Sequence, residues 1–268
     1  MFLRSALAAA LLWALPAAAD NSGLVGLTRI EQASPWKAVG RLDNGGGFCT
    51  ATLIAPDLVL TAAHCTYRED GTAVAAKELR FRAGFREGRA EAERNVIQIA
   101  RPEAYQYDGG EAITRIANDV ALLRLSIPIA THVISPFVVE PRLLWEGEVS
   151  VVSYGRGRED LPSFQDTCSV LRSFQGVMAM DCNVTFGSSG APVFRRDGER
   201  IRIASIISGT ASFNGVQYTT GMELPTLVTA LKRKMIAEGA PPPARIKRIG
   251  VGTRTTAGGA KFVRPGGS

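Results

Sequence analysis

The sequence predicts an all-β domain that ends in a single helix, and three observations support this prediction. Short runs of β-branched and apolar residues recur along the chain, as at Phe48–Ile54, Val120–Leu125 and Ile201–Ser208. Clusters of Gly, Asn and Asp, such as Asn44–Gly47, separate these runs, and many short strands between turns are typical of a β-barrel or β-sandwich. One amphipathic stretch, Pro225–Glu238, has apolar residues at helical spacing and a proline suited to a first helical turn.

The chain has 268 residues, of which 46% are hydrophobic, enough for one all-β domain or two small β subdomains. Its first 19 residues resemble a secretory signal peptide. Arg4 gives a positive start, Ala6–Leu15 is apolar, and Ala17–Ala19 offers small residues for cleavage before Asp20. The apolar run is shorter than the roughly 20 residues that cross a bilayer as a helix. We therefore expect no integral membrane segment after cleavage, and a secreted or periplasmic protein with its folded domain at residues 20–239.

The basic charge is concentrated at the C-terminal end. The net charge is +6 overall, yet residues 231–268 alone hold nine basic residues and one acidic residue, a net charge of +8. Residues 240–268 are rich in Gly, Pro and Arg and hold few large apolar side chains, so we expect a disordered basic tail. Such a tail can contact anionic surfaces, and the alternative is a solvated tail without function.

The four cysteines point to disulfides rather than to a metal site. An exported chain with an even, small number of cysteines favours disulfides, and four cysteines allow three pairings. The sequence has two histidines and no Cys-x-x-Cys pair, so it lacks the ligands of a tetrahedral zinc site. We predict no metal and no cofactor.

Three local sequences carry residues of hydrolytic chemistry: Thr61–Cys65 (TAAHC), Asn118–Leu125 (NDVALLRL) and Gly187–Pro192 (GSSGAP). All three resemble the active-site motifs of the trypsin/chymotrypsin serine protease family, in that family's order of His, Asp and Ser. The resemblance extends from about Trp36 to Glu238. It implies a trypsin-like fold of two antiparallel β-barrels with a C-terminal helix and an active site between the barrels.

The resemblance assigns the catalytic residues as His64, Asp119 and Ser189. A serine hydroxyl is a weak nucleophile at neutral pH and needs an adjacent base, which His64 supplies. Asp119 would fix the imidazole tautomer and stabilise its charged form. The N–H groups of Gly187 and Ser189 form the oxyanion hole by resemblance. Taken singly, these are a structural histidine and two turn residues; only their combination points to catalysis.

The resemblance also implies a disulfide between Cys49 and Cys65, directly after the histidine, and Cys168 and Cys182 then remain as the second pair. Ser188 stands where animal trypsins carry an aspartate that pairs with a new N-terminal ammonium. The Gly-Ser-Ser-Gly-Ala-Pro pattern is more similar to the bacterial branch, which includes the glutamyl endopeptidases. We therefore expect a loop ordered by hydrogen bonds and packing, without activation cleavage.

The specificity of the predicted protease is less defined. Asn183 stands six residues before the nucleophile, where trypsins carry an acid, and Ile206–Gly209 holds no histidine like that of the glutamyl-specific relatives. Without a charge in the pocket, a charged P1 side chain is costly to bind, so we expect a neutral P1 residue. Ser208 is expected to line the site beside the triad.

We therefore predict a monomeric, metal-independent serine endopeptidase acting on proteins or peptides. The alternative is a non-catalytic binding protein on the same fold. The sequence leaves open whether residues 20–34 act as a short propeptide.

Overall fold

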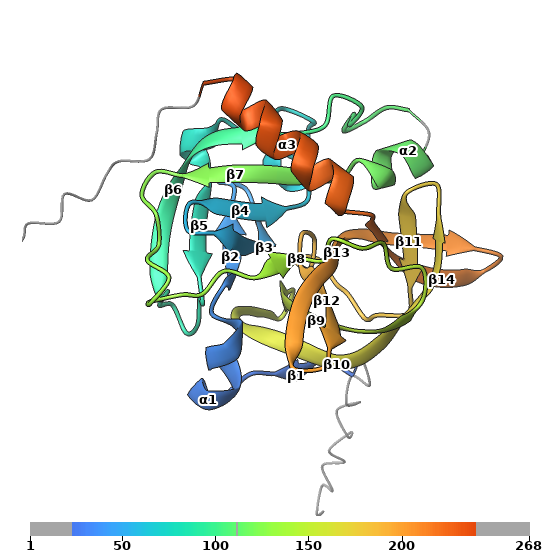
Figure 1. Cartoon of the computed structure of the whole chain (residues 1–268), viewed down its shortest axis with the longest axis horizontal. Coiled ribbons are helices and arrows are strands. Elements are labelled where there is room, and N and C mark those ends of the chain that lie inside the picture. Colours follow the sequence, from blue (N-terminus) through green and yellow to red (C-terminus); the bar gives the residue numbers. More distant parts are fainter. Residues whose placement is uncertain (1–22, 111, 240–268) are drawn as a thin grey trace, which may run out of the picture.

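The computed structural model describes residues 23–110 and 112–239, which are mostly β-strand (Figure 1). The helices are α1 (Ile30–Ala33), α2 (Ala112–Ala117) and α3 (Pro225–Ala237), with short 3-10 turns η1 (Ser34–Trp36), η2 (His64–Thr66) and η3 (Ala76–Glu78). The strands are β1 (Val25–Gly26), β2 (Val39–Asp43), β3 (Phe48–Ala55), β4 (Leu58–Thr61), β5 (Arg80–Ala83), β6 (Ala92–Ala100), β7 (Ala121–Leu125), β8 (Val138–Val139), β9 (Gly147–Gly155), β10 (Arg158–Phe174), β11 (Val177–Met180), β12 (Pro192–Asp197), β13 (Arg200–Phe213) and β14 (Val216–Met222).

Two of the expected segments cannot be placed. The predicted signal peptide (1–19) and the predicted basic tail (240–268) lie outside the described residues. Within the described ranges, no helix has the length and apolar character needed to cross a membrane.

The first half of the chain forms a closed barrel in the order β2-β3-β4-β7-β6-β5. All of its pairings are antiparallel, and the turn at Asn44–Gly47 joins β2 to β3. Alternating side chains point inward, so Leu42, Leu53 and Phe81 are fully buried in its interior. The barrel holds the β4–β7 pair, whose ends carry two of the predicted catalytic residues.

The second half forms the other sheet, ordered β1-β10-β11-β14-β13-β12-β9, with β8 added in parallel to β13. Because β9 also pairs with β10, the pairings among β9 to β14 close on themselves. The fold is therefore the trypsin-like pair of barrels with a C-terminal helix that the sequence predicted.

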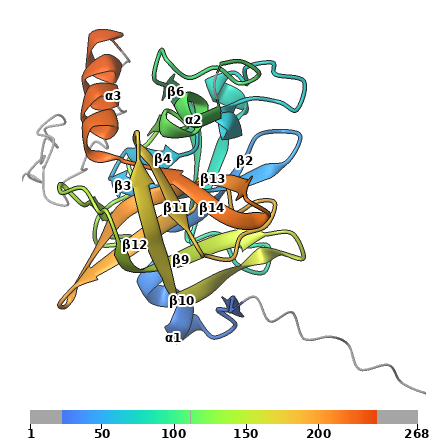
Figure 2. The same ribbon diagram turned by 90° about the vertical axis from the view of Figure 1, so that its right-hand side faces the viewer.

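Helix α3 lies across β6 and β7 of the first barrel, and Figures 1 and 2 show it at the opposite end of the molecule from α1. Val228, Leu231 and Met235 are buried on its inner face. The side-chain amide of Gln98 on β6 donates to the Met235 carbonyl, 3.2 Å away. The helix thus covers the first barrel although it follows the second in the chain.

The described N-terminal residues are part of the folded body. Strand β1 pairs with β10, and Leu27 is buried with the main core. Trp36 shortly precedes β2 of the first barrel and packs against rings of the second sheet, with centroid distances of 5.0 Å to Phe164 on β10 and 5.1 Å to Phe194 on β12. The segment before β2 therefore ties the two barrels together.

Both expected disulfides are present, Cys49–Cys65 and Cys168–Cys182. The first joins β3 to the turn that bears His64, and the second joins β10 to the second residue after β11.

Replacing Cys168 and Cys182 together by alanine is expected to lower the free energy of unfolding by about 2–4 kcal/mol, because a loop of this length is no longer closed in the unfolded chain. Urea unfolding of the variant and the parent measures the difference. The fold of the first barrel below the transition should be kept, since this bridge joins β10 to the segment after β11. An unchanged unfolding midpoint would contradict the prediction.

Candidate active site

His64 and Asp119 meet because two paired strands present them at one end of the first barrel. Thr61 at the end of β4 pairs with Ala121 at the start of β7. The residues that follow Thr61 and precede Ala121 therefore lie side by side. The Asp119 carboxylate accepts two hydrogen bonds from His64, at 2.9 Å from the backbone N–H and at 2.7 Å from Nδ1. Since an ionised carboxylate only accepts, Nδ1 carries the proton and Nε2 is left as the basic nitrogen.

Ser208 adds a third hydrogen bond to this carboxylate from the second barrel. Its Oγ donates to Asp119 Oδ2 at 2.6 Å. The Asp119 side chain is only 4% exposed, whereas His64 is 29% exposed. The pair is thus fixed on its inner side and open to solvent at the imidazole.

The pKa of His64 is raised above its ordinary value. Burial alone would lower it, but the charge of Asp119 and the hydrogen bond to Asp119 outweigh burial because both favour the imidazolium. A base that accepts protons this readily is suited to general base catalysis near neutral pH.

The raised pKa predicts the acid limb of the pH profile. A general base must be neutral, so kcat/KM should fall as the pH drops through the raised pKa of His64, with a midpoint above about 6.5. The same shift means that protonated His64 stabilises the fold at low pH, and this contribution is lost as the pH rises through the raised pKa. Hydrolysis of a neutral peptide ester measured from pH 5 to 9 tests the activity limb. A midpoint below 6 would contradict the expectation.

Ser189 lies in a tight loop between β11 and β12. Gly187 and Gly190 adopt φ of +91° and +76°, a left-handed conformation that glycine reaches at little cost. A Cβ on Gly187 would stand 2.3 Å from the Phe48 ring, and one on Gly190 would stand 2.3 Å from the Thr50 carbonyl. The loop is held against the first barrel because the Thr50 N–H donates to the Ser189 carbonyl at 2.9 Å.

The backbone of this loop leaves two donors free. Among residues 23–110 and 112–239, neither the Gly187 nor the Ser189 N–H donates to a protein acceptor. The intervening Ser188 is fully buried instead, and its Oγ accepts from the Thr185 N–H at 3.2 Å and lies 3.3 Å from Ser153 Oγ. Internal hydrogen bonds therefore order the loop where trypsins use an aspartate.

His64 and Ser189 line the same cavity, of about 610 Å³. Among the described residues the Ser189 hydroxyl makes no hydrogen bond to the imidazole, and the Nε2 atom of His64 lies 3.8 Å from Cys65 Sγ. Catalytic hydrogen bonds of this kind are often long without substrate. His64 and Ser189 thus line one opening, and Asp119 is linked to it through its hydrogen bond to His64.

A second cavity, of about 540 Å³, lies on the other side of His64 and includes Asp119, Ser208 and Thr210 in its walls. Strand β13 forms one edge of it. Up to Ile206 this strand pairs with β12, and from Ile207 it pairs with β14. In the described part of the chain, one edge of residues 208–213 has no strand partner.

The two predicted specificity residues are not brought together. Ser208 contacts Asp119, whereas Asn183 lines a smaller cavity of about 190 Å³ with Thr210, Gln217 and Tyr218. The Asn183 backbone N–H donates to Gln165 Oε1 at 2.8 Å. Asp181 also lines this cavity and accepts from the Ser169 N–H. The other wall residues are uncharged.

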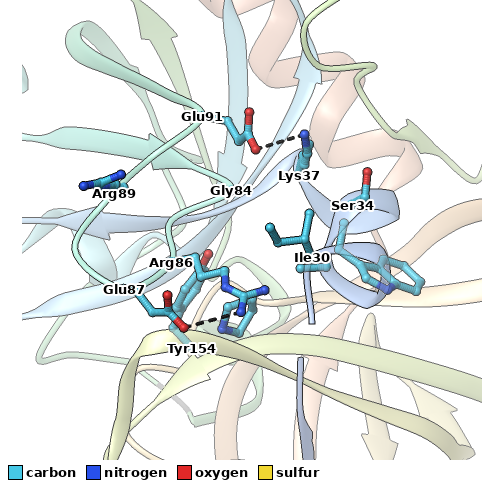
Figure 3. Close-up of a pocket in the computed structure, with 12 residues that line it drawn as sticks. Ile30, Ser34, Lys37, Gly84, Arg86, Glu87, Arg89, Glu91 and Tyr154 are labelled. Atoms are coloured by element: carbon cyan, nitrogen blue, oxygen red, sulfur yellow. Dashed lines mark hydrogen bonds and ion pairs between the residues drawn. The ribbon is translucent and has the colours of Figure 1, made fainter. Parts of the chain in front are cut away.

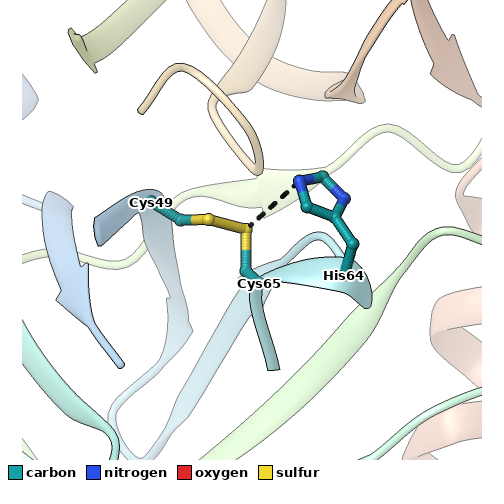
Figure 4. A group of neighbouring side chains, drawn as sticks. All are labelled: Cys49, His64 and Cys65. Carbon is teal, nitrogen blue, oxygen red and sulfur yellow. Dashed lines mark hydrogen bonds between the residues drawn. A yellow bond between two sulfur atoms is a disulfide. The ribbon is translucent and has the colours of Figure 1, made fainter. Parts of the chain in front are cut away.

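Two groups of side chains bring metal-ligating atoms together in the described ranges, and both contain a disulfide. Figure 4 shows the first, Cys49, His64 and Cys65. The second is Cys168, Cys182 and Asp181. Cysteine binds metal as the thiolate, and these sulfurs are bonded to each other. Neither group is suited to a metal.

A further cavity, of about 450 Å³, holds none of the triad residues (Figure 3). It lies between the α1–η1 segment and the residues that link β5 to β6. Four of its charged residues form two ion pairs, Lys37 with Glu91 at 2.9 Å and Arg86 with Glu87 at 3.4 Å. Its chemistry offers no nucleophile beside a base.

A comparison with protein families shows to which family this chain belongs. The profile of the trypsin-like peptidase domain matches residues 49–201, more than half of the chain. The chain belongs to the trypsin-like peptidase family. This confirms the resemblance drawn from the three motifs.

Solved trypsin-like structures share the fold. A Glu endopeptidase in complex with MPD superposes with a TM-score of 0.66 at 18% identity, covering 81% of this chain and 98% of its own. The protease Anisep from Arthrobacter nicotinovorans gives 0.59 at 18% identity, covering 75% and 96%. No curated protein matches the sequence.

Sequence reasoning missed several residues of the trypsin-like site. Phe48, Tyr67, Tyr107 and Phe186 line the cavity that His64 and Ser189 share. The clearest signal was that of Phe186, which directly precedes the Gly187–Pro192 motif. The other rings come from segments that only the fold brings near Ser189.

Proposed function

We propose that this trypsin-like peptidase is a serine endopeptidase that cleaves peptide bonds through Ser189, His64 and Asp119. One observation carries the proposal. His64, which is hydrogen-bonded to Asp119, lines the same cavity as Ser189, and the backbone N–H groups of Gly187 and Ser189 in that cavity are free to donate. Nucleophile, oriented base and oxyanion donors around one cavity are the parts that acyl transfer requires.

The residues divide the reaction as follows. Nε2 of His64 takes the proton from the Ser189 hydroxyl as Oγ attacks the scissile carbonyl carbon. The carbonyl oxygen becomes an oxyanion that accepts from the N–H groups of Gly187 and Ser189. The imidazolium, stabilised by Asp119, gives its proton to the leaving amine as the C–N bond breaks. Water then attacks the acyl-enzyme with the same base and frees Ser189.

We propose that the open edge of β13 binds the acyl part of the substrate, which precedes the scissile bond. An extended peptide can pair with unpartnered backbone groups of residues 208–213, which run past Ser208 into the cavity beside Asp119. Backbone pairing of this kind accepts many sequences. We therefore expect an endopeptidase with protein or peptide substrates.

A neutral P1 side chain is proposed because Asn183, Thr210 and Gln217 offer amides and hydroxyls, and the Asp181 carboxylate in the same wall already accepts from the Ser169 N–H. A peptide-library cleavage profile of the protein lacking residues 1–19 tests this point. Cleavage confined to sites after Lys and Arg, or after Glu, would contradict a neutral preference.

The alternative is a non-catalytic binding protein on the same fold. A fluorophosphonate probe separates the two because it reacts only with an activated serine. We expect one label per chain, located on Ser189 by mass spectrometry, with Ser135, which is more exposed than Ser189, unlabelled as an internal control. A folded protein that takes up no label would favour the binding protein.

The proposed location is secreted or periplasmic, because paired disulfides persist in oxidising compartments. We propose that residues 240–268 hold the protease at anionic surfaces by charge.

Truncation after Gly239 is expected to leave turnover of small peptides unchanged and to remove binding to anionic vesicles at low salt. Sedimentation of both forms with phosphatidylglycerol vesicles at low and high salt measures this, with neutral vesicles as the control. Equal binding of both forms would contradict a role for the tail.

A further inference from the structure

The cavity that His64 shares with Ser189 has aromatic walls. Phe48, Tyr67, Tyr107 and Phe186 contribute rings, and the Cys49–Cys65 disulfide adds apolar surface. The Gly45–Gly47 turn also lines the cavity, and an added Cβ on Gly45 or Gly46 would meet nothing within 4 Å. The cavity therefore combines aromatic walls with a segment that is bare of side chains.

Phe186 is the most exposed of these rings and is nevertheless held in place. Its side chain is 72% exposed, directly before the proposed oxyanion donor Gly187. The Arg156 guanidinium lies over its ring at 4.2 Å from the centroid, and the Arg156 N–H donates to the Phe186 carbonyl at 2.8 Å. A ring has two faces and the guanidinium occupies one, so a rigid aromatic face remains beside the nucleophile.

Phe48 has a different role in the same wall. Its ring fills the space that a Gly187 side chain would need, and Arg41 lies over it at 4.5 Å. Changing Phe48 would disturb the nucleophile loop itself. Phe186 is therefore the residue through which the wall can be altered without altering the loop packing.

The rim of the cavity also carries charge. Glu69 and Asp70 are exposed on it, and the neighbouring Arg68 pairs with Glu78 at 3.0 Å. Because both rim carboxylates face water, their attraction for a cationic side chain is screened. The apolar rings adjoin the reacting atoms directly, so their contribution is the larger one.

We infer that this cavity binds the leaving-group side of the substrate and favours a large apolar or aromatic residue directly after the scissile bond, with Phe186 as the specificity-determining side chain. The inference rests on the proposed function. If the acyl part pairs with the open edge of β13, the chain leaves Ser189 on the opposite side of His64, which is this cavity.

An acyl-transfer experiment can measure binding on the leaving-group side separately from binding of the acyl part. A peptide ester with a neutral residue next to the ester forms the Ser189 acyl-enzyme and releases its alcohol. An added amino acid amide then competes with water: its amine attacks the acyl carbon, a new amide bond forms, the ester bond to Ser189 breaks, and His64 returns the proton to Ser189 Oγ. The acyl group is constant, so product ratios report only how each nucleophile fits the cavity.

We expect phenylalanine amide to capture the acyl-enzyme about 10-fold better than glycine amide, the lower range for apolar discrimination in a pocket. Phe186→Ala should reduce this ratio several-fold, and Phe186→Leu should restore part of it. Phe174→Ala is the matched control, since Phe174 is 59% exposed and lines none of the cavities described above. It should leave the ratio unchanged.

Two outcomes overturn the inference: equal capture of both amides by the parent protein, or arginine amide outcompeting phenylalanine amide, which would give the selectivity to Glu69 and Asp70. Both leave the proposed function standing, because ester turnover through Ser189 continues. Absence of any ester turnover by the folded parent protein would instead refute the proposed function.

Discussion

Replacement of Ser189 by alanine is expected to lower kcat for peptide hydrolysis by about 10⁶-fold, the scale of nucleophile loss in serine proteases. The substitution removes one hydroxyl from a loop whose backbone bonds, from Thr50 N–H to the Ser189 carbonyl and from Gly190 N–H to the Ile207 carbonyl, do not involve that hydroxyl. Initial rates on a chromogenic peptide over hours, with a highly purified sample, measure the loss.

The control is Ser135→Ala, at an exposed serine that lines neither of the cavities beside His64. It should keep full activity, and both variants should unfold at the parent temperature. A folded Ser189→Ala protein that still cleaves peptides at the parent rate would remove Ser189 from the mechanism.

Replacement of Asp119 by asparagine is expected to lower kcat by about 10⁴-fold, as this change does in serine protease triads. The amide has one acceptor oxygen where the carboxylate accepts from His64 N–H, His64 Nδ1 and Ser208 Oγ. Its NH₂ group can face Nδ1 and turn the imidazole into the wrong tautomer. Without the charge of residue 119, burial has the larger effect on the pKa of His64, and this pKa should fall. The acid limb of the residual activity should therefore move to lower pH.

Asp57→Asn is the matched control. Asp57 is 21% exposed and pairs with Arg124 at 2.6 Å on the first barrel, away from the cavities beside His64. This variant should lose stability and keep kcat. An Asp119→Asn protein with a parental kcat and a parental acid limb would show that His64 does not depend on this carboxylate.

The fold was predictable where the sequence carries local signals. The run Phe48–Ile54 lies within β3, and the run Val120–Leu125 contains β7. The helical spacing after Pro225 matches α3. Strand β10 was not predicted, because Arg158–Phe174 mixes charged and apolar residues and includes a proline. Its order comes from pairing with β1, β9 and β11, and no single run of sequence contains that information.

The candidate site divides in the same way. His64, Asp119 and Ser189 could be named because each stands in a short motif. The Cys49–Cys65 pairing followed from the resemblance and left Cys168 and Cys182 as the second pair. The residues of the cavity walls could not be predicted. Tyr107 and Phe186, for example, are 79 residues apart in the sequence and line the same cavity only in the folded chain. The contact between Ser208 and Asp119 also joins two barrels.

The Cys49–Cys65 bridge adjoins His64, so the order of the active-site turn depends on whether this disulfide has formed. In a reducing cytosol the two sulfurs stay apart, and the turn that bears His64 lacks its cross-link to β3. The nucleophile loop has the buried, hydrogen-bonded Ser188 where a charged partner for a new N-terminus would stand. Under the proposed function and location, we expect the protein to reach full activity once the Cys49–Cys65 bridge forms, a step that a reducing cytosol would delay until export.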